Sequence, residues 1–109
     1  MEKPAKKPKL AEKDVQRQIM EYLKMRGYFF FRNNTGGFTN SKGHYYRFGY
    51  VGSGDIFGFT KSGRFFSIEV KATGKKPTPE QHEFMAKVND TGNLAFYADN
   101  LETVMFYLK

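Results

Sequence analysis

The chain has 109 residues, the size of one domain, and a formal net charge of +7. That charge favours a polyanionic partner, either nucleic acid or an anionic membrane surface. Because cysteine is absent, a disulfide framework and a thiolate metal site are excluded, and the composition suits a reducing cytoplasm. No apolar run approaches the ~20 residues of a membrane span, and the lysine-rich start lacks the apolar segment of a signal peptide, so neither is expected. Of the two polyanionic partners, DNA is the expected one and a membrane is not.

The first nine residues differ in composition from the rest of the chain. Residues 1–9 carry four lysines, two prolines and one glutamate, and they cannot bury apolar surface, so they are predicted to be a disordered basic tail. Such a tail is either simply solvated or acts as a basic arm that raises nonspecific affinity for phosphates, and these two interpretations are compatible. Residues 10–109 are predicted to form a single domain.

The segment 10–26 has helical periodicity. Its apolar residues recur at i, i+4, i+7 and i+8, and Gly27 supplies a stop; these apolar residues are Val15, Ile19, Tyr22 and Leu23. Glu12 and Gln16 lie two turns and one turn before Ile19 and border the apolar stripe. Two interpretations of Glu12 stay open, a first-turn acid favoured by the helix dipole and a functional carboxylate.

An aromatic run, residues 28–33, is predicted to be the first strand, buried on both faces. Residues 34–53 are polar and glycine-rich and are predicted to be a long loop without secondary structure, which in a small domain is usually functional or mobile. Basic groups meet phosphates and aromatic rings stack on bases, so a nucleic-acid-gripping flap and a flexible excursion both remain open. The candidate contacts in this loop are Lys42, His44, Tyr46 and Arg47.

The segment 54–71 is predicted to be a β-hairpin. Thr60 and Arg64 flank a three-residue loop in which Gly63 takes the left-handed position of a type I turn with a G1 bulge. This register places Asp55 opposite Glu69, and alternation along the strand adds Lys71 to the same face. The opposite face would carry apolar side chains, namely Ile56, Phe66, Ile68 and Val70.

Two facing carboxylates on a partly apolar face are destabilising unless a positive charge lies between them. A hard divalent ion such as Mg²⁺ prefers oxygen ligands, which Asp55, Glu69 and the Val70 carbonyl can supply. A lysine beside the ion can orient or deprotonate a bound water and stabilise charge on a scissile phosphate. The sequence therefore predicts a metal-and-lysine site for phosphodiester chemistry, with Lys71 as the lysine.

The remaining elements are a turn at 72–76, a helix that begins after Thr78, a short buried strand at 94–98 and a closing helix at 101–108 capped by Asp99 or Asn100. Lys75 and Lys76, in the turn, are further candidate phosphate contacts. Gln81 is explained equally by a capping box with Thr78 and by a role at the site. The expected fold is α/β (α+β), a small mixed sheet flanked by helices in the order α-β-β-β-α-β-α.

These residues together resemble the PD-(D/E)XK nuclease superfamily, and within it the VRR-NUC (virus-type replication-repair nuclease) domain. The resemblance covers residues 10–108. It is carried by five matches: the helix with Glu12 and Gln16, the segment Gly52-Ser53-Gly54-Asp55, the motif Glu69-Val70-Lys71, Gln81 at the start of the next helix, and Gly92 followed by Leu94-Ala95-Phe96. One departure is Gly54, where the family commonly has proline, so a looser backbone before Asp55 is expected.

The resemblance implies a restriction-endonuclease-like fold and a Mg²⁺- or Mn²⁺-dependent DNA endonuclease. Asp55, Glu69 and Lys71 would be catalytic, Glu12 would reach the metal directly or through water, and Gln81 would position the lysine or water. Family members made of this domain alone, typically from phages and bacteria, resemble Holliday-junction resolvases that act as homodimers, which implies a bacterial or phage-infected cytoplasm. Alternatives that stay open are a flap or single-strand nuclease, a noncatalytic nucleic-acid-binding module, and a purely structural charge network.

Overall fold

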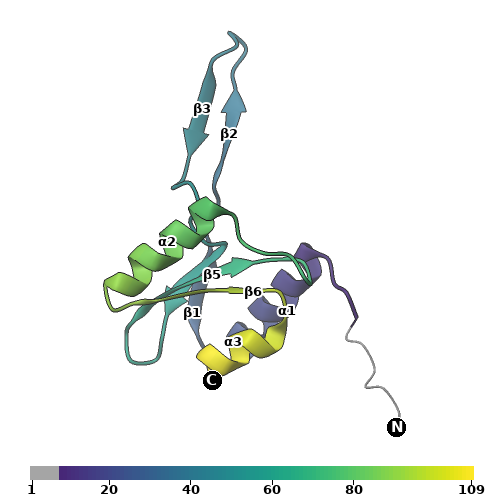
Figure 1. Ribbon diagram of the computed structural model, residues 1–109, viewed down its shortest axis with the longest axis vertical. Coiled ribbons are helices and arrows are strands. Elements are labelled where there is room, and N and C mark those ends of the chain that lie inside the picture. Colours follow the sequence, from purple (N-terminus) through teal and green to yellow (C-terminus); the bar gives the residue numbers. More distant parts are fainter. Residues whose placement is uncertain (1–7) are drawn as a thin grey trace.

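The computed structural model describes residues 8–109, and residues 1–7 of the predicted tail lie outside this part. The elements run α1 (Glu12–Met25), β1 (Phe29–Arg32), β2 (Gly36–Thr39), β3 (Tyr45–Phe48), β4 (Ile56–Phe59), β5 (Phe65–Val70), α2 (Pro79–Asp90), β6 (Leu94–Ala98) and α3 (Leu101–Tyr107), as Figure 1 shows. The predicted mixed α+β fold is confirmed. In the part of the chain that the structure describes, no helix is long and apolar enough to cross a bilayer.

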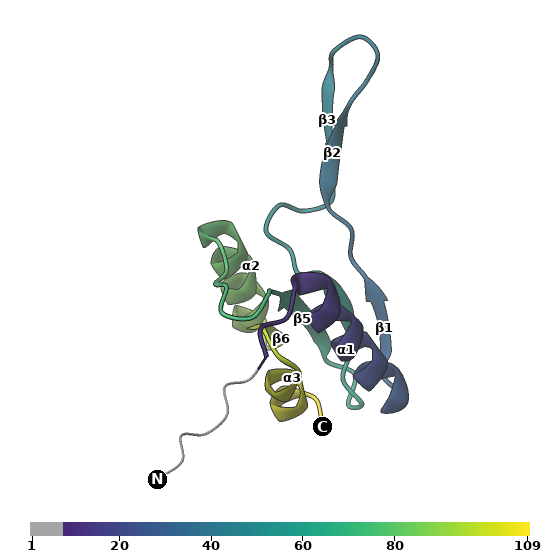
Figure 2. The same ribbon diagram turned by 90° about the vertical axis from the view of Figure 1, so that its right-hand side faces the viewer.

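The central sheet has the strand order β1-β4-β5-β6. β1, β4 and β5 are antiparallel neighbours, whereas β6 pairs parallel to β5 after the α2 crossover. Helices α1 and α3 cover one face and α2 lies on the other, so β5 runs through the centre of a three-layer arrangement (Figure 2). Residues on β5 are therefore the most enclosed in the sheet, which matters for any charge placed there.

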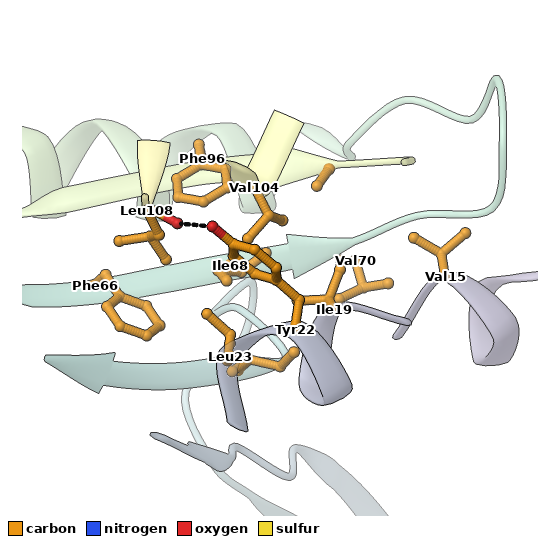
Figure 3. Close-up of a cluster of buried hydrophobic side chains, with 12 residues drawn as sticks. Val15, Ile19, Tyr22, Leu23, Phe66, Ile68, Val70, Phe96, Val104 and Leu108 are labelled. Atoms are coloured by element: carbon orange, nitrogen blue, oxygen red, sulfur yellow. Dashed lines mark hydrogen bonds between the residues drawn. The ribbon is translucent and has the colours of Figure 1, made fainter. Parts of the chain in front are cut away.

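The main core lies between the sheet and the pair α1 and α3 (Figure 3). The four apolar residues predicted for α1 are all buried, and so are Ile56, Phe66, Ile68 and Val70 on the facing side of the hairpin. Tyr22 donates a 2.7 Å hydrogen bond from its hydroxyl to the carbonyl of Leu108, which ties α1 to the end of α3. This packing fixes the α1 face of β4 and β5 and leaves their other face for the charged residues.

The predicted register of the hairpin 54–71 is confirmed. Phe59 pairs with Phe65 and Ile56 with Ile68, while Thr60 donates to the Arg64 carbonyl at 2.7 Å across the turn. Gly63 has φ +93°, the left-handed conformation that the turn requires and that side chains with a β-carbon rarely adopt. The pairing of the two strands therefore places Asp55 and Glu69 at opposed positions.

The prediction of a structureless loop over residues 34–53 is wrong. β2 and β3 form an antiparallel hairpin in which Gly36 pairs with Phe48 and Thr39 with Tyr45. This hairpin, called the arm from here on, projects away from the central sheet, and within residues 8–109 it pairs with no other strand (Figure 1). The radius of gyration of 15.9 Å accordingly exceeds the ~13 Å of a compact domain of this length.

The prediction that the first strand is buried on both faces is also wrong. β1 is an edge strand, and Phe29 and Phe31 are 67% and 48% exposed. Phe30, which points to the α1 side, is half-buried against the core. The physical reason is topological, because α2 covers β5 and β6, reaches β4 through the ring contact of Phe84 with Phe57, and makes no contact with β1.

Candidate metal and catalytic site

Asp55 is held at the start of β4 by two hydrogen bonds to β5. Its backbone N–H donates to the Ile68 carbonyl at 2.8 Å, and its Oδ2 accepts from the backbone N–H of Val70 at 2.7 Å. One carboxylate oxygen is thus fixed, and the side chain is directed along the sheet toward Glu69. The register of the hairpin and this side-chain bond together determine where the Asp55 carboxylate lies.

Glu69 lies on the central strand and is only 4% exposed. Its Oε1 accepts a 2.8 Å hydrogen bond from Gln81 Nε2, and the Lys71 ammonium lies 3.9 Å from the same oxygen. The other oxygen, Oε2, is buried and has no hydrogen-bond donor among the described residues. An ionised carboxylate with one unsatisfied buried oxygen is a costly arrangement that a cation or a proton would relieve.

The electrostatics of this carboxyl agree with its geometry. Burial, the charge of Asp55 and a hydrogen bond between the two carboxyls together raise the pKa of Glu69 from 4.5 to about 8, against the opposing effect of the Lys71 charge. That hydrogen bond exists only when Glu69 is protonated, since two ionised carboxylates have no proton to share, and so Oε2 is unsatisfied in the ionised form. Two carboxyl groups this close together cannot easily both be ionised, so they hold either a shared proton or a cation.

Gln81 forms the capping box that its sequence position allowed, and its side chain also contacts Glu69. Its side-chain oxygen accepts from the Thr78 backbone N–H at 2.8 Å, and the Thr78 hydroxyl accepts from the Gln81 backbone, which completes a capping box at the start of α2. Its side-chain nitrogen, which the cap does not use, donates to Glu69. The two ends of one amide therefore do two jobs, and the cap fixes the direction in which the amide donates.

Lys71 directly follows β5 and is anchored by its backbone. Its N–H donates to the Ala98 carbonyl at 2.9 Å, and its side chain is only 14% exposed. Lys71 lies two residues after Glu69, and side chains two residues apart share a face of a strand, so the ammonium lies on the same face as the carboxylate pair. The lysine is thus placed beside the two acids, as the hairpin register predicts.

Glu12 lies at the start of α1 and is exposed. Its charge contributes to the raised pKa of Glu69, but it is the smallest of the contributions. Across residues 8–109, no three side chains of the His, Cys, Asp and Glu types gather into a ready-made metal cluster. A water-mediated role suits the position of Glu12 better than direct coordination.

The donor set fits a hard divalent ion of the Mg²⁺ type. Asp55 and Glu69 supply two carboxylates, and the Val70 carbonyl lies between Glu69 and Lys71. Because Oε2 of Glu69 has no hydrogen-bond donor among the described residues, a cation bound there would stabilise it. Mg²⁺ usually binds through one or two carboxylates and keeps several waters. A site with two acids is therefore sufficient for this ion, although it would be too sparse for a fully protein-bound metal.

The predicted nucleic-acid contacts fall into two groups. Lys42, His44, Tyr46 and Arg47 are exposed on the arm, where Tyr46 stacks on Phe38 with 5.4 Å between ring centroids. Lys75 and Lys76 lie between β5 and α2, and the Lys76 ammonium is 3.4 Å from the Tyr97 hydroxyl. Tyr97 pairs with Glu69 in the sheet, so Lys76 lies over the β6 side of the central sheet, whereas the arm lies beyond the end of the sheet.

Sequence reasoning missed Asn33, which clamps the segment before Asp55. Its backbone N–H donates to the Asp55 carbonyl at 2.8 Å, and its side chain donates to Ser53 Oγ at 2.8 Å and to the Gly54 carbonyl at 2.9 Å. The expectation of a loose backbone at Gly54 is wrong, because the residue is buried and hydrogen-bonded. A β-carbon at this position would overlap the hydroxyl of Ser67, so the close approach of β5 requires glycine.

No known protein family, curated protein or solved structure matches the chain.

Proposed function

We propose that the protein is a Mg²⁺- or Mn²⁺-dependent DNA endonuclease that hydrolyses phosphodiester bonds. The observation that carries the proposal is the pair of half-buried Asp55 and buried Glu69, with an unsatisfied oxygen on Glu69 and the Lys71 ammonium beside it. Two opposed carboxylates followed by a half-buried lysine form a donor set that suits a hard cation next to a phosphate. The resemblance to VRR-NUC nucleases assigns the same three residues to catalysis.

Each residue has a distinct part in this proposal. Asp55, Glu69 and the Val70 carbonyl would hold the ion, which supplies Lewis-acid stabilisation of the phosphate and a more acidic water. Lys71 donates to the phosphate oxygen that gains charge or orients the attacking water. Gln81 holds Glu69 Oε1 and leaves Oε2 for the metal, and Glu12 would hold a water at the edge of the site.

Branched DNA is the proposed substrate class, with a four-way Holliday junction cut by a homodimer as the preferred case. A two-fold symmetric junction matches two identical active sites. The choice of junction and dimer rests on the resemblance alone, while the exposed basic and aromatic residues of the arm support binding to nucleic acid more generally. Flap or single-strand cleavage by the same site is the nearest alternative.

A second candidate is a noncatalytic nucleic-acid-binding module. The arm favours it, because Lys42, Tyr46 and Arg47 would grip nucleic acid whether or not the carboxylates hold a metal. A purely structural charge network is a third possibility, but Glu69 Oε2 gains no donor from such a network. The buried and unsatisfied Glu69 therefore weighs in favour of the enzyme.

The testing experiment is a panel of labelled junction, flap, duplex and single-stranded DNAs incubated with Mg²⁺ or Mn²⁺, beside a measurement of mass in solution. A nuclease cuts at least one branched substrate, and EDTA stops the cut. If every substrate stays intact with both metals while binding weakens steeply with salt, the noncatalytic module is the correct account.

A further inference from the structure

A groove of about 390 Å³ runs between α1 and β1, outside the site described above. Its rim carries four cations, Lys13, Arg17, Lys24 and Arg32, and its floor contains Met20 and Phe30. Glu21 is the one acid among the residues that line it, and Arg17 is paired with Asp14 at 3.4 Å, so the groove keeps a net excess of positive charge. All four cations are exposed, whereas Met20 and Phe30 are half-buried.

The groove lies on the α1 face of the sheet, whereas Glu69 points to the α2 face, and the two come nearest at the end of the sheet where Asp55 precedes β4. Lys13 follows Glu12 at the start of α1, and Arg32 pairs with Ile56, the residue after Asp55. α1 and β1 then run side by side away from this end (Figure 2). Lys13 and Lys24 are separated by about 16 Å along the helix axis, which is the length of several nucleotides of one strand.

We propose that this groove binds a single strand of nucleic acid and leads it to the site. A basic rim meets phosphates, and an apolar floor with an aromatic ring accepts unstacked bases, which is the combination found in single-strand channels. A base-paired duplex would present only phosphates here and would leave Phe30 and Met20 without a partner. The inference deepens the proposed nuclease function, on which it rests, by giving the strand that reaches the metal a path along α1.

A tryptophan reporter tests whether bases reach the floor of the groove. The chain has no tryptophan, so Phe30→Trp introduces a single fluorophore in the groove, and Phe29→Trp places one on the opposite face of β1 as the matched control. With EDTA present, oligo-dT should quench the fluorescence of the Phe30→Trp protein and leave that of the Phe29→Trp protein unchanged. Equal quenching of both proteins, or quenching of neither, overturns the proposal.

A charge-matched pair of double variants tests the rim. Arg17→Gln with Lys24→Gln removes two groove cations, and Arg64→Gln with Lys87→Gln removes the same two residue types from the α2 side of the molecule. The groove variant should bind single-stranded DNA about tenfold more weakly and lower the slope of log Kd against log salt by about 1.4. Equal losses of affinity in the two variants would show that only the net charge of the protein matters, and would overturn the groove assignment.

A labelled acidic amphipathic peptide distinguishes the other possible occupant. If the peptide binds the wild-type protein and not the groove variant, while single-strand binding is the same in both, then the groove belongs to a protein partner and the proposal fails. All these measurements are made without metal and without cleavage. Quenching of the Phe30→Trp protein together with no cleavage of any substrate would therefore support the groove proposal and contradict the nuclease proposal. The failures of the two proposals are thus distinguishable.

Discussion

The side chain of Gln81 donates a 2.8 Å hydrogen bond to Oε1 of Glu69. The oxygen of the same amide accepts from the Thr78 backbone, so the N-cap of α2 and the buried carboxylate share one side chain. The hydrogen bond thereby fixes the start of α2 relative to β5, and the amide can donate in only one direction. This arrangement connects the stability of α2 with the electrostatics of the candidate site.

Replacement of Gln81 separates its two roles. Gln81→Glu keeps an oxygen for the Thr78 backbone but has no N–H for Glu69 and adds a third carboxylate, so we expect a lower metal-free melting temperature that Mn²⁺ restores. Thr78→Ala is the control, because it weakens only the cap, costs about 1 kcal/mol and leaves the response to Mn²⁺ unchanged. A Gln81→Glu protein that melts like the wild type in EDTA would contradict the contact.

The raised pKa of Glu69 predicts a pH-dependent stability in the absence of metal. Burial and the neighbouring Asp55 raise this pKa from 4.5 to about 8, so the folded protein holds more protons than the unfolded chain between these values. The free energy of unfolding therefore decreases as pH rises from about 4.5 to about 8. Urea unfolding in EDTA at several pH values measures this slope. Glu69→Gln should flatten it, and Mg²⁺ or Mn²⁺ should stabilise the wild type more at pH 8 than at pH 5. An equal slope in Glu69→Gln would assign the dependence to other groups.

The close approach of Gly54 to β5 predicts a coupled pair of substitutions. Gly54→Ala should reduce the free energy of unfolding by roughly 1–3 kcal/mol, because the new β-carbon overlaps the Ser67 hydroxyl. Ser67→Ala removes that hydroxyl, which has no hydrogen-bond partner among the described residues. The double variant should recover part of the loss, with the remainder due to the Ile68 carbonyl at 3.0 Å from the β-carbon position. Strict additivity of the two changes in denaturant unfolding would rule out the overlap.

Removal of the arm should leave the domain folded. The strands β2 and β3 pair only with each other in the described sheets, so replacing residues 36–48 by a short Gly-Ser linker removes no strand of the central sheet. We expect a melting temperature close to that of the wild type and weaker binding of branched DNA, measured by fluorescence anisotropy. Unchanged DNA affinity in the shortened protein would show that the arm is not a nucleic-acid contact.

The central hairpin was predictable because its turn is local. Gly63 and the three-residue loop determine the register, and the register brings Asp55, Glu69 and Lys71 to one face without any information about the rest of the fold. The capping box of α2 follows equally from local sequence. For Gln81 the sequence left a capping role and a role at the site as alternatives, and it did not predict the contact with Glu69, because a sequence does not show that one amide can serve the cap and a carboxylate at once.

The arm and the edge position of β1 were not predictable for physical reasons. Gly36 and Gly37 disfavour a strand, and what compensates is the covering of each glycine by an aromatic ring from β3, Phe48 over Gly36 and Tyr45 over Gly37. The run of aromatics in β1 is typical of a buried strand, and its exposure depends on how far α2 extends across the sheet. The Asn33 clamp likewise requires the three-dimensional position of Gly54.

The most direct measurement is the cleavage of a labelled four-way junction in Mg²⁺ by the wild type, by Asp55→Asn and by Lys71→Ala. Lys76→Ala is the control for the loss of one nearby lysine charge. All four proteins should be folded by thermal melting. The account predicts cleavage by the wild type that EDTA abolishes, a loss of at least about a hundredfold in the first two variants, and only a modest loss in the third. Cleavage by Asp55→Asn and Lys71→Ala at the wild-type rate would contradict the assignment of the site.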